Sequence, residues 1–160
     1  MIGIHFMSAN TFHLKAFLSG NVIPIEKVKD PVFSTKMLGE GLAIEPTICT
    51  VLAPCDGIIS MTMPDTKHAI GISAANGMEL LIHIGLDTVR LKGKGFQLFV
   101  KKGDSVKTGD KLLQFDSKLI QEKGFLLTSI LTVLNSEHYP TMKLHTDMEA
   151  LAGENIIIEI

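Results

Sequence analysis

Short apolar or alternating segments, rather than helical repeats, dominate the chain. Most of them are bounded by Gly, Pro, Asp or Asn, and examples are "NVIPI", "GLAIEP", "GIISM", "ELLIHIG", "KLLQFD" and "NIIIEI". Short apolar or alternating runs between such turn residues are typical of β-strands. Strands that recur about every 8–12 residues favour an all-β antiparallel sandwich or barrel. We therefore expect an all-β fold with only short helical turns.

Turn and helix signals refine this picture. Asn76-Gly77 lies between two apolar runs and predicts a β-hairpin. "KGDSVKTGDKLL" contains two Gly-Asp turns around a short strand. Residues 117–124 resemble a short helix, with Ser117 as its cap and Gly124 as its stop. "IEKVKD" favours one further helical turn.

The chain reads as one domain over residues 1–160. A chain of 160 residues buries about two-thirds of its unfolded surface, which is enough for a substantial core. No linker or shift in composition divides it. "SGNVIPI" and "DGIISM" share a polar residue, a glycine and a branched apolar tail, which hints at a duplicated strand unit.

Composition and charge narrow the class of protein. Net charge is −2 and no Lys/Arg block stands out, so nothing indicates binding to nucleic acid. Cys49 and Cys55 are too close along one extended segment for a disulfide and predict free thiols in a reducing compartment. The first 17 residues lack the pattern of a signal peptide, and no apolar run approaches the roughly 20 residues that span a bilayer. We expect a cytoplasmic protein.

Two of the six histidines stand in unusual surroundings. His83 ends the apolar run "ELLIH", and His68 begins "HAIGI" on the other side of the predicted hairpin turn. A bulge or a wider loop would bring the two rings together across adjacent strands. The other four are expected to be ordinary surface residues: His5, His13, His138 and His145.

The histidine pair permits three interpretations. His83 alone could be a core residue held by one hydrogen bond. With Asp87 as third ligand, His68 and His83 could form the zinc site of a hydrolase, although no established zinc motif is present. A neutral imidazole is also a good nucleophile near pH 7 and can carry a phosphoryl group. In that case the carbonyl groups of Ile84-Gly85-Leu86 offer an acceptor for the Nδ1 proton, and Nε2 becomes the attacking atom.

"GMELLIHIGLDTV" resembles the active-site signature of glucose-type enzyme IIA domains of the bacterial phosphotransferase system at every position. "DPVFSTKMLGEGLAIEPT", "APCDGII", "TKHAIGI" and "VKKGDSVKTGDKLLQFD" extend the resemblance over about residues 16–135. The resemblance implies a duplicated hybrid (barrel-sandwich) fold. It also implies a carrier that takes a phosphoryl group from the histidine phosphocarrier HPr and passes it to an enzyme IIB domain of a sugar permease. We expect no metal or other cofactor, and contact with the membrane only through the permease.

The resemblance also assigns roles to individual residues. His83 would be phosphorylated at Nε2, His68 would contact the phosphoryl group, and Thr66 would hydrogen-bond His68. The Gly85 carbonyl would hold Nδ1 of His83. Acidic and apolar residues around the pair would dock the partner proteins: Asp30, Val32, Phe33, Ile70, Leu81, Ile84, Asp87 and Val89. Leu81 and Pro64 stand where some relatives carry phenylalanine, so the docking rim is aliphatic here.

Two further functions compete with this interpretation. Biotinyl and lipoyl carrier domains share a similar fold but need a lysine at a hairpin tip. Here Met61-Thr62-Met63 has threonine at that position, which argues against a swinging arm. A module that docks on permeases or metabolic enzymes according to its phosphorylation state is compatible with phosphotransfer, because a dianion at His83 alters an apolar surface.

Overall fold

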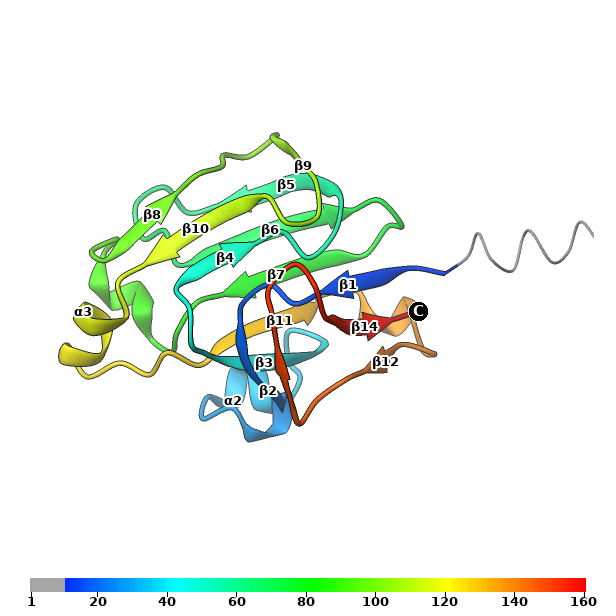
Figure 1. Cartoon of the computed structure of the whole chain (residues 1–160), viewed down its shortest axis with the longest axis horizontal. Coiled ribbons are helices and arrows are strands. Elements are labelled where there is room, and N and C mark those ends of the chain that lie inside the picture. Colours follow the sequence, from blue (N-terminus) through cyan, green and yellow to red (C-terminus); the bar gives the residue numbers. More distant parts are fainter. Residues whose placement is uncertain (1–10) are drawn as a thin grey trace, which may run out of the picture.

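The computed structural model of the chain describes residues 11–160 (Figure 1). These residues form fourteen short strands, and all of the strand pairs are antiparallel. The strands are β1 (His13–Lys15), β2 (Gly20–Pro24), β3 (Glu40–Pro46), β4 (Thr50–Leu52), β5 (Gly57–Thr62), β6 (Ala69–Ala74), β7 (Glu79–His83), β8 (Phe96–Leu98), β9 (Ser105–Val106), β10 (Lys111–Phe115), β11 (Ser129–Val133), β12 (Lys143–Leu144), β13 (Met148–Ala150) and β14 (Ile156–Glu159).

The strands form one large sheet and two small ones. The large sheet has eight strands in the order β13-β2-β3-β11-β7-β6-β5-β9. The small sheets have three strands each, β1-β14-β12 and β4-β10-β8. The expectation of an all-β antiparallel fold with short helical turns is confirmed.

The helical segments are short and lie between strands. They are η1 (Ile25–Lys27), α2 (Pro31–Ser34), η2 (Thr88–Leu91), α3 (Ser117–Glu122) and η3 (Ser136–His138). The helix expected at 117–124 is present as α3, but its cap is Asp116 rather than Ser117. Asp116 directly precedes the helix, and its carboxylate reaches into the first turn. There Oδ1 accepts a hydrogen bond from Leu119 N–H at 3.1 Å. The helical turn predicted in "IEKVKD" is η1, and α2 was not predicted.

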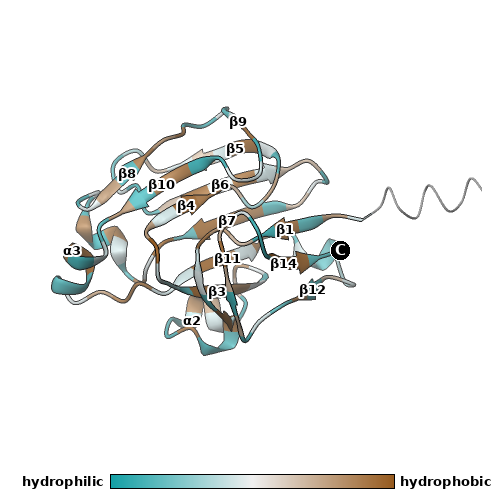
Figure 2. Ribbon diagram, in the orientation of Figure 1, coloured by the Kyte–Doolittle hydropathy of each residue, from teal (hydrophilic) through white to brown (hydrophobic). Residues whose placement is uncertain are grey.

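One large cluster of buried hydrophobic residues, drawn from strands of all three sheets, forms the core. Figure 2 shows hydrophobic residues along the strands and hydrophilic residues at many of the turns. A second, smaller cluster lies under η1 and α2, against β3 and β11 (Figure 1). Its buried members are Ile25, Val28, Phe33, Ala43, Leu86 and Ile130. Since Ile130 pairs with His83 in the ladder between β11 and β7, this cluster borders the end of β7.

The large sheet is built from two matching halves. Read from its two ends, the order is β13-β2-β3-β11 and β9-β5-β6-β7, so that β2 and β5 occupy equivalent places. These are the strands of the two similar segments in the sequence.

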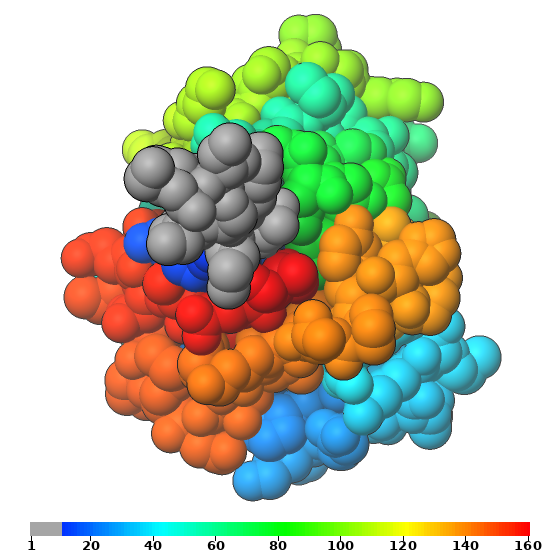
Figure 3. Space-filling view, turned by 90° about the vertical axis from the view of Figure 1, so that its right-hand side faces the viewer, coloured from blue at the N-terminus to red at the C-terminus, as the bar shows by residue number. Residues whose placement is uncertain are grey.

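Backbone contacts repeat with the halves. Ala16 N–H donates to Asn155 O and Ala53 N–H donates to Asp110 O, each at 2.8 Å. Gly153 N–H and Gly109 N–H donate back to the carbonyls of the same two alanines, both at 2.9 Å. The strands on either side of these contacts, β1 with β14 and β4 with β10, also correspond. In Figure 3 the first described strand (blue) lies beside the last one (red). The duplicated type of fold is therefore present.

The sequence also led to expectations about the cysteines, the other four histidines and membrane-spanning segments. Cys49 and Cys55 are free thiols. His138 is exposed, and His13 and His145 are about one-third exposed and both lie beside Glu159 at the surface. His5 lies outside the described residues. So do the first ten of the 17 residues for which no signal peptide was expected. Within residues 11–160, no helix has the length and hydropathy needed to cross a membrane.

Candidate functional site

A hairpin brings the two singled-out histidines together. β6 and β7 are joined by the predicted Asn76-Gly77 turn, and their ladder pairs Ala69 with His83. His68 lies one residue beyond this ladder, and its carbonyl accepts a hydrogen bond from Ile84 N–H at 2.8 Å. The imidazole rings meet edge to face, with centroids 4.8 Å apart. Of the two routes expected from the sequence, the wider loop is present and the bulge is not: residues 75–78 connect β6 to β7, and the ladder runs without a shift from Ser73–Glu79 to Ala69–His83.

Each ring is oriented through its Nδ1 atom. His83 Nδ1–H donates a hydrogen bond to the carbonyl of Gly85 at 2.9 Å, and His68 Nδ1 shares one with Thr66 Oγ1 at 3.0 Å. Because a carbonyl can only accept, the neutral His83 ring must carry its proton on Nδ1. The lone pair then lies on Nε2, which is the tautomer that a nucleophilic imidazole needs.

The surroundings of His83 keep its ring uncharged. Burial is the main cause that lowers the pKa of His83, to about 4, and the neighbouring His68 lowers it further. The Gly85 carbonyl, Asp30 and Asp87 oppose this change but do not cancel it. Burial also lowers the pKa of His68. Both rings are therefore neutral at pH 7, and they can stand close together without repulsion.

Only glycine fits at position 85. Gly85 has φ +72°, in the left-handed region that side chains disfavour. A Cβ atom there would lie 2.5 Å from Thr88 Cγ2 and 2.9 Å from the Leu126 carbonyl oxygen. The turn can therefore close tightly under the His83 ring, and this closure places the Gly85 carbonyl within reach of Nδ1.

The short helix α2 covers one side of the site. Asp30 Oδ1 accepts from Val32 N–H at 3.0 Å, and Pro31 occupies the first helical position, where its missing N–H has no consequence. The helix presents Phe33, whose ring packs against His83 with centroids 5.0 Å apart. The Asp-Pro pair is a helix-start signal, and it was available in the sequence.

Two ion pairs of Lys36 connect the segment that contains α2 to the large sheet. Lys36 Nζ lies 3.1 Å from both Glu26 Oε2 and Glu40 Oε2. These carboxylates raise the pKa of Lys36, the hydrogen bond with Glu26 being the largest cause. Since Glu26 lies on η1 and Glu40 begins β3, Lys36 connects the two ends of the segment that carries Phe33.

The predicted docking residues separate into surface and core. Val32 and Val89 are 41% and 47% exposed, Asp87 is exposed, and Asp30 and Leu81 are half-buried. Phe33 is almost fully buried but contacts His83.

Two of the predicted docking residues cannot contact a partner. Ile70 and Ile84 have no exposed surface and belong to the main hydrophobic core. The prediction of a docking role for them is wrong, because the apolar segments around the histidines are covered on both faces. These two side chains support the site from within.

The zinc alternative is not supported. It required a third ligand beside the two histidines, and Asp87 was the candidate. Among residues 11–160, no three His, Cys, Asp or Glu side chains are placed to hold one metal ion. The pair lacks the ligand set of a zinc hydrolase.

Known proteins share both the sequence and the fold. The chain is 45% identical over 143 residues to a "PTS system glucose-specific EIIA component" of Oceanobacillus iheyensis, covering 89% of this chain and 86% of that protein. A protein of the same name from Bacillus cereus is 43% identical over the same length. The solved structure of glucose permease IIA from Mycoplasma capricolum superposes with a TM-score of 0.84 at 34% identity, over 94% of this chain and 96% of that one.

A family model matches residues 12–139 of the chain, which include the hairpin, both histidines, α2 and the Gly85 turn. The family is described as "phosphoenolpyruvate-dependent sugar phosphotransferase system, EIIA 1". Its matched region and the relatives cover most of the described fold. The chain belongs to this EIIA family and is a component of a sugar phosphotransferase system.

Proposed function

We propose that the chain is a cytoplasmic phosphohistidine carrier that accepts a phosphoryl group from HPr on His83 and passes it to an enzyme IIB domain of a sugar permease. One observation carries this proposal: a neutral His83 donates Nδ1–H to the Gly85 carbonyl beside the second imidazole. Glucose is the sugar that we infer for the coupled uptake, because the relatives from Oceanobacillus and Bacillus are named glucose-specific.

The transfer uses the fixed tautomer. The Nε2 lone pair of His83 attacks the phosphorus on the donor's phosphohistidine, and a new N–P bond forms while the donor's N–P bond breaks. The donor ring keeps the released electron pair. The product ring on His83 carries positive charge, which the Gly85 carbonyl stabilises by accepting a hydrogen bond from Nδ1–H. Transfer to the IIB nucleophile reverses these steps.

His68 is suited to assist this transfer. Its Nδ1 is held by Thr66, so its ring is oriented toward His83 at 4.8 Å between centroids. In the tautomer with the proton on Nε2, this ring can donate a hydrogen bond to a phosphoryl oxygen as charge moves onto His83. His68 is itself buried, so it shields this side of His83 from water that could hydrolyse the phosphohistidine.

The surroundings suit brief contact with two partners. Val32 and Val89 form an exposed apolar rim, and Asp30 and Asp87 add negative charge beside it. Small apolar contacts with complementary charge at the rim favour rapid association and release. A partner with basic residues around its own reactive group fits this surface.

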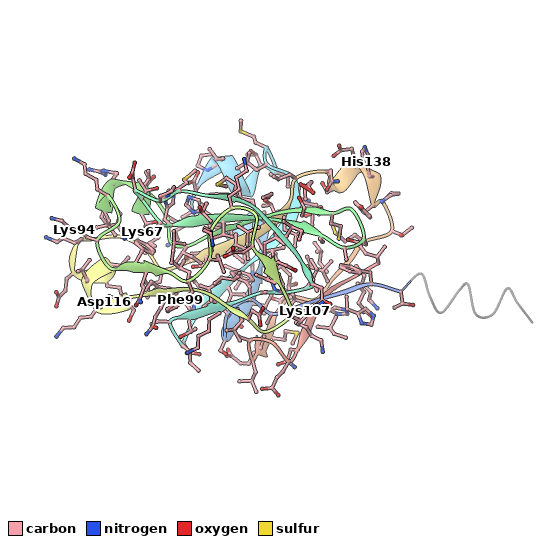
Figure 4. The ribbon with its side chains drawn as sticks, turned by 90° about the horizontal axis from the view of Figure 1, so that it is seen from above. Lys67, Lys94, Phe99, Lys107, Asp116 and His138 are labelled. Carbon is pink, nitrogen blue, oxygen red and sulfur yellow. The ribbon has the colours of Figure 1, made fainter. Side chains whose placement is uncertain are left out.

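The test is phosphorylation from phosphoenolpyruvate with purified enzyme I and HPr, followed by intact mass. We expect one acid-labile, base-stable phosphoryl group on the wild type and none on His83→Gln. His68→Gln should accept the group but transfer it to IIB slowly. His138→Gln is the matched control, because His138 is exposed and lies on the other side of the molecule from Lys67, the neighbour of His68 (Figure 4). Unchanged phosphorylation of His83→Gln would overturn the proposal.

A further inference from the structure

The turn that holds His83 is itself held by two hydroxyl groups. In the Ile84–Gly85 peptide, the carbonyl oxygen belongs to Ile84 and accepts a hydrogen bond from the Thr88 hydroxyl group. Its N–H belongs to Gly85 and donates to Ser129 Oγ at 3.2 Å. Both ends of this peptide plane are therefore fixed by buried side chains, because Thr88 and Ser129 have no exposed surface.

The next peptide, Gly85–Leu86, contacts the active-site ring directly. Its carbonyl accepts a hydrogen bond from Nδ1–H of His83, and its N–H, on Leu86, donates to Leu126 O at 3.1 Å. The two peptide planes share the Cα atom of Gly85. Because glycine has wide conformational freedom, the direction of this carbonyl depends on what holds the neighbouring plane.

Ser129 is well suited to hold it. Its hydroxyl donates to the Leu127 carbonyl at 2.8 Å, so the proton points away from Gly85 and a lone pair faces the Gly85 N–H. Ser129 begins β11, which pairs with β7 through Ile130 and His83. The strand that borders His83 thus also carries the side chain that locks the turn after it.

We infer that Ser129 is a positioning residue for the phosphoryl carrier: through Gly85 it fixes the carbonyl that keeps His83 in the tautomer with its lone pair on Nε2. This inference rests on the proposed function only for its consequence in phosphotransfer. The tautomer of the free protein can be measured without any partner. Ser129 does not contact the reacting atoms, so its effect is indirect.

The primary experiment compares wild type with Ser129→Ala by long-range ¹H–¹⁵N correlation of the His83 ring at pH 7. Removing the hydroxyl leaves the Gly85 N–H buried without its partner, and this destabilises the present turn. We expect wild type to show the Nδ1–H tautomer almost alone. Ser129→Ala should show a clearly larger fraction of the Nε2–H tautomer, together with an acceptance rate from phospho-HPr lowered about tenfold.

Two further variants separate positioning from general destabilisation. Ser129→Thr keeps the hydroxyl and should retain the wild-type tautomer. Thr132→Val is the matched control, because Thr132 lies on the same strand, is equally buried, and its Oγ1 has no hydrogen-bond partner among the described residues. It should leave the tautomer and the rate unchanged. Thermal unfolding of all variants checks that they are folded under the conditions of the measurement.

The outcomes are distinct. A wild-type tautomer in folded Ser129→Ala would overturn the inference, and so would the same tautomer change in Thr132→Val. If the tautomer changes in Ser129→Ala alone while wild type takes no phosphoryl group from phospho-HPr, the proposed function fails and the positioning role stands.

Discussion

Protonation of His83 should couple the stability of the fold to pH. Burial and His68 lower its pKa from 6.5 to about 4 in the folded protein, and the unfolded chain regains the ordinary value. Below pH 6.5 the unfolded state therefore binds a proton that the folded state does not bind. The free energy of unfolding falls as pH decreases through this range, and the loss is complete once the pH is below about 4.

The size of this loss of stability follows from the difference between the two pKa values of His83, 6.5 in the unfolded chain and about 4 in the folded protein. One pKa unit corresponds to about 1.4 kcal/mol, so lowering the pH from 7 to 4.5 should remove roughly 2–3 kcal/mol through His83 alone. Other groups titrate over the same interval, so the test must compare variants. His83→Gln removes the titrating ring, and we expect it to lose roughly 2–3 kcal/mol less than wild type on acidification.

Urea unfolding at pH 7 and pH 4.5 measures this difference from the midpoints, provided that the slopes with urea agree. His138→Gln is the control, because its exposed side chain does not change desolvation on unfolding. It should lose as much stability as wild type. Equal losses for wild type and His83→Gln would show that the fold does not hold His83 uncharged, and the reasoning from burial would be refuted.

Three further outcomes can be checked on the same protein. Gly85→Ala should lower the free energy of unfolding by about 1–3 kcal/mol in urea and abolish phosphoryl acceptance, because the new methyl group meets Thr88 at 2.5 Å and the left-handed φ is strained. Thr132→Val should leave stability unchanged or raise it by up to about 1 kcal/mol in urea, since it removes a buried hydroxyl without a partner; a clear loss would contradict this. Thiol labelling at pH 8 should reach Cys49 first, because burial raises the pKa of Cys55 to about 12, and early labelling of Cys55 would refute the packing around it.

Local sequence spacing explains which parts of the site were predictable. The contact of His83 with Gly85 spans two residues, and the hairpin that brings His68 close depends on one Asn-Gly turn. Both are consequences of neighbouring residues, so patterns in the sequence indicate them. The all-β fold is equally local in origin, because its signals are short alternating runs and turn residues.

Contacts between distant segments explain what was missed. Ser129 reaches Gly85 from β11, and no periodicity connects these two residues. Phe33, which reaches His83 from α2, was placed beside the histidine pair only by the family resemblance. The misplaced docking roles of Ile70 and Ile84 have another cause. Those roles were carried over from the family resemblance, which matches positions along the chain and not the exposure of side chains. Ile70 lies on the largely buried strand β6, and Ile84 follows β7 with no exposed surface.

The matching halves of the large sheet give His83 a counterpart position with a different side chain. β11 and β7 meet at the centre of the sheet, where Leu131 pairs with Ile82. On either side of this central pair, His83 faces Ile130 and Leu81 faces Thr132, so the place that corresponds to His83 in the other half is held by Thr132. A backbone that repeats itself thus carries a histidine at one of two equivalent positions and a threonine at the other. Duplication leaves one copy of a position free to acquire chemistry, while its counterpart keeps the sheet together.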